Sequence, residues 1–312
     1  MTPREEHEDA ITAEEMTTTV VPGPASHRLH RQKRPNACMV LSSLPRTMLI
    51  WLTVTELMKP KQPRTSPPTA PPNPPTANRH IFKSRSGLGA YIDSPASFPP
   101  SRVISHSDQF VVIHDLYPKS SVHLLLLPRD PSISSTHPLT ALTTRPEFLS
   151  AVRAEVDKLK GLVASELRRR YGAFSASDKA RNDALEQAME SDDPPSEAEL
   201  EAQLPPGRNW VESVMAGVHA HPSMSHLHIH IISCDRFSPC LKNRKHYNSF
   251  STGFFVPIED FPLDDADVRW HPGREGYLRE DMKCWRCGLN FEGKFVRLKD
   301  HLEEEFEVWR RK

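Results

Sequence analysis

The sequence predicts an α+β protein in which helices pack against an antiparallel sheet, followed by a small C-terminal unit built around two cysteines. Two strand-like runs at 110–115 and 122–128 flank a short turn at 117–119, a pattern typical of a hairpin. A third run, 226–232, alternates histidine with aliphatic residues at the two-residue period of a strand. Between them, residues 147–171 carry apolar side chains at the period of a helix.

The N-terminal quarter differs in composition from the rest of the chain. The protein has 312 residues, with 40 basic and 40 acidic side chains and 30 prolines. Residues 1–79 are polar and rich in proline, so we expect a disordered tail there. Two compact units are then expected, a larger domain at 80–260 and a small C-terminal domain at 261–312.

Two features of this tail bear on where the protein acts. The apolar run 37–58 is interrupted by Pro45 and Arg46, so it does not predict a membrane span. The basic cluster 30–35 is typical of a nuclear import signal, although such clusters also occur without that role.

The five cysteines of the whole chain predict no disulfide framework and favour a reducing compartment. Together with the basic cluster, this leads us to expect a nuclear protein.

The compact part begins with elements that precede the hairpin. Residues 87–92 predict a short helix on which Leu88 and Tyr91 share a face, either as a stacking surface for a ligand or as ordinary core. Asp115, at the end of the first hairpin strand, is by itself only a turn-forming residue.

The segment after the hairpin predicts one long helix and one insertion. The helix at 147–171 has its apolar stripe at spacings of three and four residues, formed by Phe148, Val152, Val156, Leu159 and Leu162. Residues 175–206 are acidic and polar, and we expect a mobile surface loop. Residues 210–218 then predict a strand that returns the chain to the sheet.

The run 226–232 (HLHIHII) is the most informative stretch. Its alternation places His226, His228 and His230 on one face of a strand and the aliphatic residues on the other. Buried imidazoles cost desolvation free energy unless they are hydrogen-bonded or charged, so this face predicts a functional site. A solvated histidine face and a zinc site remain alternatives.

The histidine run resembles the signature of the histidine-triad (HIT) superfamily of nucleotide hydrolases and transferases. The neighbouring runs 217–225 (GVHAHPSMS) and 238–243 (SPCLKN) are similar to the aprataxin branch of that superfamily, and the resemblance extends from about residue 82 to the C-terminus. It implies a HIT-like antiparallel sheet with flanking helices. It also implies hydrolysis of 5′-adenylated DNA ends, which releases AMP and a 5′-phosphate.

The resemblance also assigns roles to residues. His228 is expected to be the nucleophile, with its second ring nitrogen held by a backbone carbonyl. His226 and His230 are expected to donate hydrogen bonds to phosphate, and His219 to protonate the leaving 5′-phosphate. The nucleotide pocket is expected to consist of Asp115 for the ribose, Ile113, Leu116, Leu88 and Tyr91 for the base, His123 facing the triad, and Lys119 and Ser223 for phosphate.

Residues 242–247 (KNRKHY) form a basic run close to Phe250 and Phe254. Cationic and aromatic side chains together suit a phosphate backbone and a frayed DNA end, so Lys242, Lys245 and His246 are candidate DNA contacts. A solvated loop is the alternative.

The C-terminal unit contains the pattern of a zinc site. Cys284 and Cys287 form a Cys-x-x-Cys knuckle, and His301 and Glu305 lie four residues apart on an expected helix. Glu304 is the alternative fourth ligand, and cysteines without a metal are the alternative for the whole cluster. The pattern is similar to the finger of fungal aprataxins, which uses two cysteines, a histidine and a glutamate, and it implies one structural zinc.

Three functions compete at this point. The first is a monomeric deadenylase acting on adenylated nicks, double-strand ends or RNA–DNA junctions. The second is a general HIT hydrolase of small adenylates, for which a finger would be unnecessary. The third is a zinc-finger nucleic-acid-binding protein with an inactive HIT scaffold, which the intact histidines disfavour.

Overall fold

The structure is a computed structural model that describes residues 85–191 and 195–312. The expected disordered tail 1–79, the basic cluster 30–35 and the apolar run 37–58 lie outside the described residues. Within the described ranges, no helix is long and apolar enough to cross a membrane.

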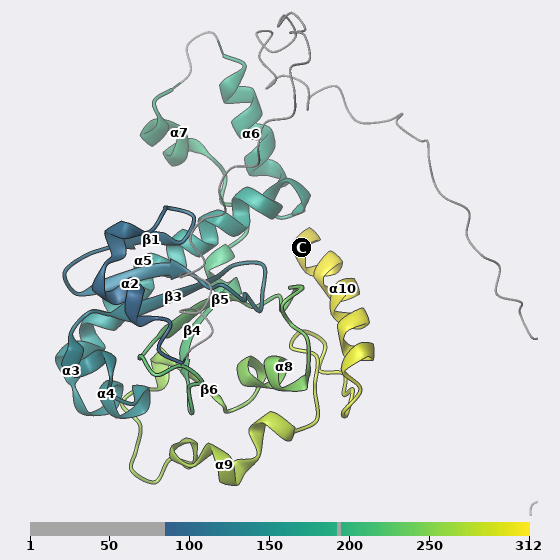
Figure 1. Cartoon of the computed structure of the whole chain (residues 1–312). Helices are drawn as coiled ribbons and strands as arrows, with labels where there is room; N and C mark the ends of the chain where they lie inside the picture. The colour runs from purple at the N-terminus through teal and green to yellow at the C-terminus, as the bar shows by residue number, and fades with distance from the viewer. Residues whose placement is uncertain (1–84, 192–194) are drawn as a thin grey trace, which may run out of the picture. The chain divides into compact units, whose positions relative to one another are not determined.

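A six-stranded, wholly antiparallel sheet organises the domain expected at 80–260 (Figure 1). The strand order is β1-β2-β3-β5-β4-β6, and β2 pairs with β3 as the predicted hairpin. Pairing register places His230 of β5 between Leu125 of β3 and Gly217 of β4. The strands are β1 (Val103–His106), β2 (Phe110–His114), β3 (His123–Pro128), β4 (Val214–His219), β5 (Ile229–Ser233) and β6 (Phe255–Pro257).

The two-residue period of the strands divides the sheet into two apolar faces. Val112, Leu126 and Ile231 pack against the long helix α5 (Pro146–Tyr171) in the main core. Val111 and Leu125 face the opposite side, where they pack against the short helix α2 (Gly89–Asp93). The remaining short elements between α2 and α5 are η3 (Pro95–Ser97), α3 (Pro131–Ser134) and α4 (Pro138–Thr144).

Helix α5 confirms the prediction for 147–171, with one error in its apolar stripe. Leu162 is 46% exposed, and Val163 is the buried residue of that turn. The stripe steps from Leu159 by four residues to Val163 and then to Leu167, so Leu162 rotates toward solvent.

Strand β5 begins at Ile229 and not at His226 as predicted. The backbone N–H of Leu227 donates to the carbonyl of Ser134 at 2.7 Å, which takes it out of the sheet ladder. Leu227, Ile229 and Ile231 are nevertheless buried in the main core, so the predicted aliphatic face is confirmed.

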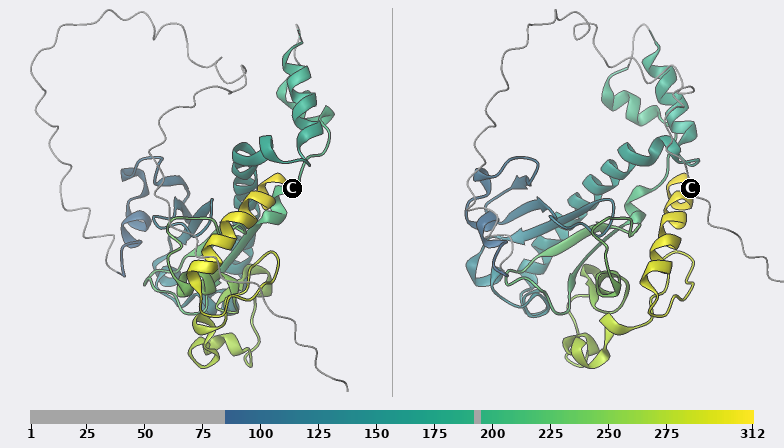
Figure 2. Two further views of the ribbon diagram at one scale, coloured as in Figure 1. Left: turned by 90° about the vertical axis from the view of Figure 1, so that its right-hand side faces the viewer. Right: turned by 45° about the vertical axis from the view of Figure 1, so that its right-hand side comes forward.

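The prediction of a mobile loop at 175–206 is wrong for most of that segment. It contains helices α6 (Lys179–Met189) and α7 (Glu197–Gln203), which extend beyond the end of α5 in both views of Figure 2. Alanine, leucine and glutamate favour a helix even where no core is buried, and Ser196 with Glu199 forms a capping box at α7.

The base of this insertion is anchored to the domain. The buried carboxylate of Asp178 accepts hydrogen bonds from the indole N–H of Trp210 and the backbone N–H of Arg208, both at 2.8 Å. Short 3₁₀ helices, η4 (Gly172–Phe174) and η5 (Trp210–Ser213), stand at its two ends, so the predicted strand at 210–218 begins only at Val214.

The C-terminal region packs against the sheet domain through several elements. Gly217 allows β6 to approach β4, because a Cβ at this position would lie 2.5 Å from the carbonyl oxygen of Val256. The rings of Tyr171 and Trp309 lie 5.8 Å apart and join the last helix to α5. The elements are α8 (Arg244–Ser251), η6 (Ile258–Asp260), η7 (Val268–Trp270), α9 (Pro272–Glu275), η8 (Tyr277–Arg279) and α10 (Phe295–Arg311).

Candidate active site and metal cluster

A cavity of about 720 Å³ opens on the sheet face opposite α5. Thirteen of the predicted site residues line it, drawn from five separate stretches of the chain: Leu88, Tyr91, Ile113, Asp115, Leu116, Lys119, His123, His219, Ser223, His228, His230, Lys245 and His246. Two predicted residues, His226 and Lys242, are not part of the lining.

His228 has the geometry expected of a nucleophile. Its Nδ1 lies 2.8 Å from the carbonyl oxygen of His226, and a carbonyl can only accept, so Nδ1 carries the proton. Nε2 then keeps its lone pair. Burial lowers the pKa of this imidazole, so it stays neutral near pH 7. The predicted backbone-carbonyl partner is thereby confirmed.

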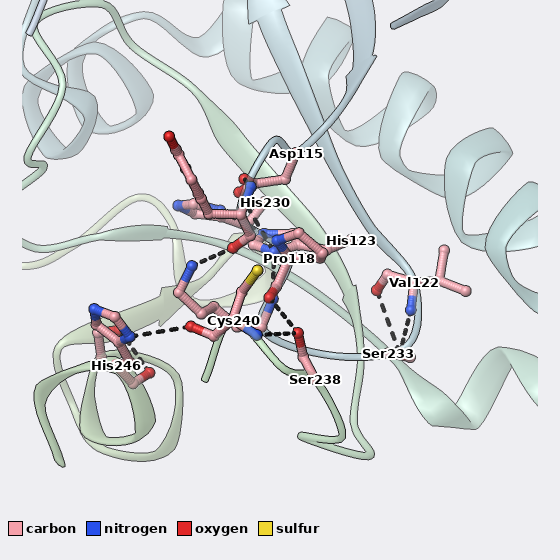
Figure 3. A network of polar contacts seen from close by, with 12 residues as sticks. Asp115, Pro118, Val122, His123, His230, Ser233, Ser238, Cys240 and His246 are labelled. Carbon is pink, nitrogen blue, oxygen red and sulfur yellow. Dashed lines mark hydrogen bonds and ion pairs between the residues drawn. The ribbon is translucent and has the colours of Figure 1, made fainter. Parts of the chain in front are cut away.

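A relay of hydrogen bonds fixes the proton on His230 (Figure 3). The backbone N–H of Lys119 donates to Nδ1 of His123 at 3.2 Å, so Nε2 of His123 carries the proton. That Nε2 lies 2.9 Å from Nδ1 of His230, which must accept. Nε2 of His230 is therefore an N–H donor, and it is buried with no hydrogen-bond partner among the described residues.

Asp115 stands beside this relay at the cavity wall. Its Oδ2 lies 3.4 Å from Nδ1 of His123, a longer contact than the hydrogen bond from Lys119. Its Oδ1 accepts from the backbone N–H of Tyr117 at 2.7 Å. Burial outweighs the nearby carboxylate and lowers the pKa of His123 to about 4, so the relay remains uncharged near neutral pH.

His219 lies among aromatic rings beside His230. Its ring centroid is 4.4 Å from that of His230, 4.7 Å from Phe250 and 5.3 Å from Phe254. Burial, with smaller effects from neighbouring cationic groups, lowers its pKa to about 3. Its Nε2 is also buried, and within the described part of the chain it has no hydrogen-bond partner. Phe250 and Phe254 thus belong to the site, although the sequence indicated only that they are nearby.

His226 occupies a different place from its two companions. It packs against helix α2, because a Cβ on Gly89 would lie 3.0 Å from its Cε1 atom. Its carbonyl oxygen serves the site by holding His228. The structure does not place its imidazole in the cavity lining, so a direct hydrogen bond to phosphate stays a prediction.

Leu88 and Tyr91 are part of the hydrophobic core and also part of the cavity wall. Leu88 and Tyr91 are buried in the cluster that α2 makes with Val111, Ile113 and Leu125. They also line the cavity. The interpretation as core is therefore confirmed, and stacking of these side chains on a ligand stays a prediction.

The basic run 242–247 is helical from Arg244 onward, so the alternative of a solvated loop is wrong for residues 244–247. Asn243 caps α8 by accepting from the backbone N–H of His246 at 3.0 Å. The preceding turn is held by Ser238, whose hydroxyl donates to the carbonyl of Pro118 at 2.6 Å (Figure 3). Lys242 is exposed away from the cavity lining.

A second hollow of about 450 Å³ adjoins the first and shares Lys245 and Leu278 with it. Arg244 and Arg279 add two guanidinium groups to its walls. Sequence reasoning missed Arg279 and Leu278, because nothing in their local pattern indicates that η8 folds back beside α8.

The four predicted metal ligands come together. One ligand atom from each of Cys284, Cys287, His301 and Glu305 lies within 4.8 Å of all the others. Sγ of Cys287 is 3.2 Å from Nε2 of His301, which in turn is 3.4 Å from Oε1 of Glu305. This donor set and compactness fit a tetrahedral zinc ion. The cluster contains Glu305, and Glu304 is not part of it.

Comparison with known proteins gives independent results. Residues 98–237 match the model of the HIT domain, and residues 251–308 match that of the C2HE / C2H2 / C2HC zinc-binding finger. An aprataxin-like protein of Schizosaccharomyces pombe is 38% identical, over 72% of this chain and 82% of the relative. One from Saccharomyces cerevisiae is 35% identical, over 71% and 95%.

A solved structure is similar in both sequence and fold. The crystal structure of the aprataxin ortholog Hnt3 in complex with DNA has a TM-score of 0.55 and 34% identity, covering 72% of this chain and 96% of that one. The chain belongs to the aprataxin family.

Proposed function

We propose that this protein hydrolyses 5′-adenylated DNA ends through a covalent adenylyl-histidine, releasing AMP and a DNA 5′-phosphate. The observation that carries the proposal is the bond between Nδ1 of His228 and the carbonyl of His226, because it leaves Nε2 as an uncharged nucleophile at the cavity. Membership of the aprataxin family supports a DNA-repair hydrolase of the HIT class.

In the first step, the lone pair of His228 Nε2 attacks the phosphorus of the adenylate. The bond between that phosphorus and the bridging oxygen breaks, and the oxygen leaves with the DNA 5′-phosphate. His230 donates its Nε2–H to a nonbridging oxygen as negative charge develops there. Asp115 accepts hydrogen bonds from the ribose at the neighbouring wall.

His219 supplies the proton for the leaving oxygen. Its imidazole is neutral when the cavity holds no anion, since its pKa is about 3. The negative charge of an incoming pyrophosphate stabilises the protonated form and raises that pKa. In the second step a water attacks phosphorus, His219 takes up the water's proton, and the electron pair returns to His228 Nε2 as AMP leaves.

The second hollow supports a nucleic-acid substrate over a small adenylate. Arg244, Lys245 and Arg279 place three cationic side chains where phosphates that continue from the adenylate would lie. A free nucleotide has no further phosphates to contact these groups. The similar Hnt3 protein was crystallised in complex with DNA, in agreement with this substrate class.

Incubation with a 5′-adenylated nicked duplex beside AMP-lysine tests the proposal. We expect a strong preference for the nick in kcat/KM. Equal kcat/KM on the two substrates would favour the general adenylate hydrolase, and DNA binding without turnover of either would favour an inactive scaffold.

We further propose that the finger binds one structural zinc and that the protein acts in the nucleus as a monomer. The donor set of the Cys284 cluster and the C2HE match support the zinc. Native mass spectrometry measures metal content and oligomeric state together. A fluorescent fusion tests the location, and exclusion from the nucleus would contradict it.

A further inference from the structure

Helix α8 contacts both the main cavity and the finger. One side of it contributes Lys245, His246, Ser249 and Phe250 to the lining of the main cavity. Its other side carries Tyr247 and Asn248, which are 0% and 1% exposed and face the finger. The nucleotide cavity and the finger are therefore separated by the thickness of a single helix.

Tyr247 contacts the cysteine knuckle directly. Its hydroxyl donates to the carbonyl of Lys283 at 2.7 Å and accepts from the backbone N–H of Trp285 at 2.9 Å. These two residues flank Cys284 in the chain. The phenol thus holds the backbone on both sides of a ligand of the predicted zinc site.

Asn248 makes a second connection, to the segment that leads into the finger. Its Nδ2 donates to the carbonyl of Glu280 at 2.8 Å and to that of Tyr277 at 3.3 Å. Leu278, the residue after Tyr277, lines the cavity itself. This amide therefore fixes a piece of the cavity wall that the finger segment supplies.

The side chains around these hydrogen bonds form one apolar cluster that includes residues of both α8 and the finger. Tyr247 and Leu241 are buried in one apolar cluster with Met282, Cys284 and the α10 residues Leu298 and Leu302. A buried cluster of this kind loses contacts as a unit when one side disorders. Neither α8 nor the knuckle can shift without exposing the other's apolar surface.

We propose that Tyr247 and Asn248 couple metal binding in the finger to the shape of the nucleotide cavity, so that zinc and an adenylate each strengthen the binding of the other. The coupling rests on the proposed function in one respect, namely that the cavity binds an adenylate. It goes beyond a finger that only holds DNA, because it predicts an effect of zinc on the binding of AMP, a ligand that carries no DNA.

Reciprocity makes the proposal quantitative. If zinc tightens AMP binding by a given factor, AMP must raise zinc affinity by the same factor. We expect about tenfold, which corresponds to about 1.4 kcal/mol of coupling free energy. A purely structural role for Tyr247 would lower stability without producing this matched pair of factors.

The first experiment compares the full chain with and without zinc. Titration calorimetry measures AMP affinity in both states, competition with a chromogenic chelator measures zinc affinity with and without AMP, and hydrogen exchange follows α8. We expect about tenfold weaker AMP binding after zinc removal, faster exchange in α8, and little change in β2 and β3.

Unchanged AMP affinity with unchanged α8 exchange would overturn the coupling. If AMP does not bind even the zinc-loaded protein, the proposed function fails. The effect of zinc on α8 exchange then decides the coupling alone, with faster exchange supporting it and unchanged exchange refuting it.

The second experiment uses Tyr247→Phe, which removes both hydrogen bonds and keeps the ring in the shared cluster. We expect the zinc–AMP coupling factor to fall from about ten to within about twofold of one. Tyr171→Phe is the matched control, since Tyr171 packs against Phe306 and Trp309 on the far part of α10. A full coupling factor in Tyr247→Phe, or equal losses in both variants, would contradict the proposal.

Discussion

Among the residues that the structure describes, two groups of side chains have the composition of a metal site, and they differ in their hydrogen bonding. The finger group is Cys284, Cys287, His301 and Glu305, and the cavity group is Asp115, His123 and His230. In the cavity group, both ring nitrogens of His123 are already hydrogen-bonded. Nδ1 accepts from the backbone N–H of Lys119, and Nε2 donates to Nδ1 of His230. In the finger group, Nε2 of His301 lies 3.2 Å from Sγ of Cys287 and 3.4 Å from Oε1 of Glu305, an arrangement of neighbouring donor atoms that suits a shared metal ion.

This difference decides how an alternating histidine run is to be interpreted here. Metal binding requires free lone pairs that converge, whereas phosphoryl transfer requires N–H donors and one free lone pair arranged around a substrate. The cavity histidines form the second arrangement. The zinc alternative for residues 226–232 is therefore disfavoured by hydrogen bonding and not by residue type.

The largest effect expected from breaking this arrangement is at the nucleophile. His228→Ala removes the attacking nitrogen, so we expect kcat on adenylated nicked DNA to fall by several orders of magnitude while DNA affinity persists. His106→Ala, at an exposed position on β1, is the control. Parallel loss of binding and activity would mean that His228 is structural.

At the finger, loss of one thiolate should remove the metal. Cys284→Ser or Cys287→Ser should reduce zinc from one per chain to none and disorder the C-terminal segment, because metal binding and folding are linked. His123→Asn should leave zinc at one per chain, since both ring nitrogens of His123 are hydrogen-bonded within the protein. Native mass spectrometry checks both results, and zinc loss in His123→Asn would reverse the assignment.

The buried histidines also predict a dependence of stability on pH. Native His219 and His123 have pKa values of about 3 and about 4, whereas an unfolded histidine titrates near 6.5. Between pH 6.5 and these values the unfolded chain binds more protons, so stability falls as pH falls. Each histidine contributes about 1.4 kcal/mol per pH unit.

Urea unfolding at saturating zinc, at pH 5 and pH 6, measures this slope. His219→Phe removes one titrating group and should flatten the slope by about 1.4 kcal/mol per pH unit. The phenyl ring suits the surroundings of Phe250 and Phe254. An unchanged slope would mean that His219 is protonated in the native state or exposed there.

The smallest expected effect is the dependence of KM on salt concentration. Raising salt from about 50 to about 200 mM should raise the KM for adenylated nicked DNA steeply and leave that for a small adenylate almost unchanged. Lys245→Ala should flatten the logarithmic salt slope by about one unit, and exposed Lys242→Ala by less. Equal slopes for both substrates would place the DNA elsewhere.

The sequence predicted the parts of this fold that have a local signal. The hairpin, helix α5 and the aliphatic face of β5 each follow from a regular period, and the zinc ligands follow from their spacing. The insertion was misjudged because low hydrophobicity was taken to indicate a loop. Helix propensity and the capping box of Ser196 and Glu199 were the better local signals.

Other features had no local signal at all. The truncation of β5 depends on a hydrogen bond from Leu227 to Ser134, which lies 93 positions earlier in the chain. The two roles of α8 depend on contacts of Tyr247 and Asn248 with residues some thirty positions later. Such contacts follow from tertiary packing, so only the structure can reveal them.

The covalent step is open to a direct test, which is to trap the intermediate on the cavity histidine. Protein quenched in alkali during turnover of a 5′-adenylated nicked duplex should gain the mass of one adenylyl group, and peptide mapping should place it on His228, because the histidine phosphoramidate survives alkali. We expect this adduct in the wild type and none in His228→Ala. An adduct on another residue, or turnover with no adduct in the wild type, would contradict the proposed mechanism.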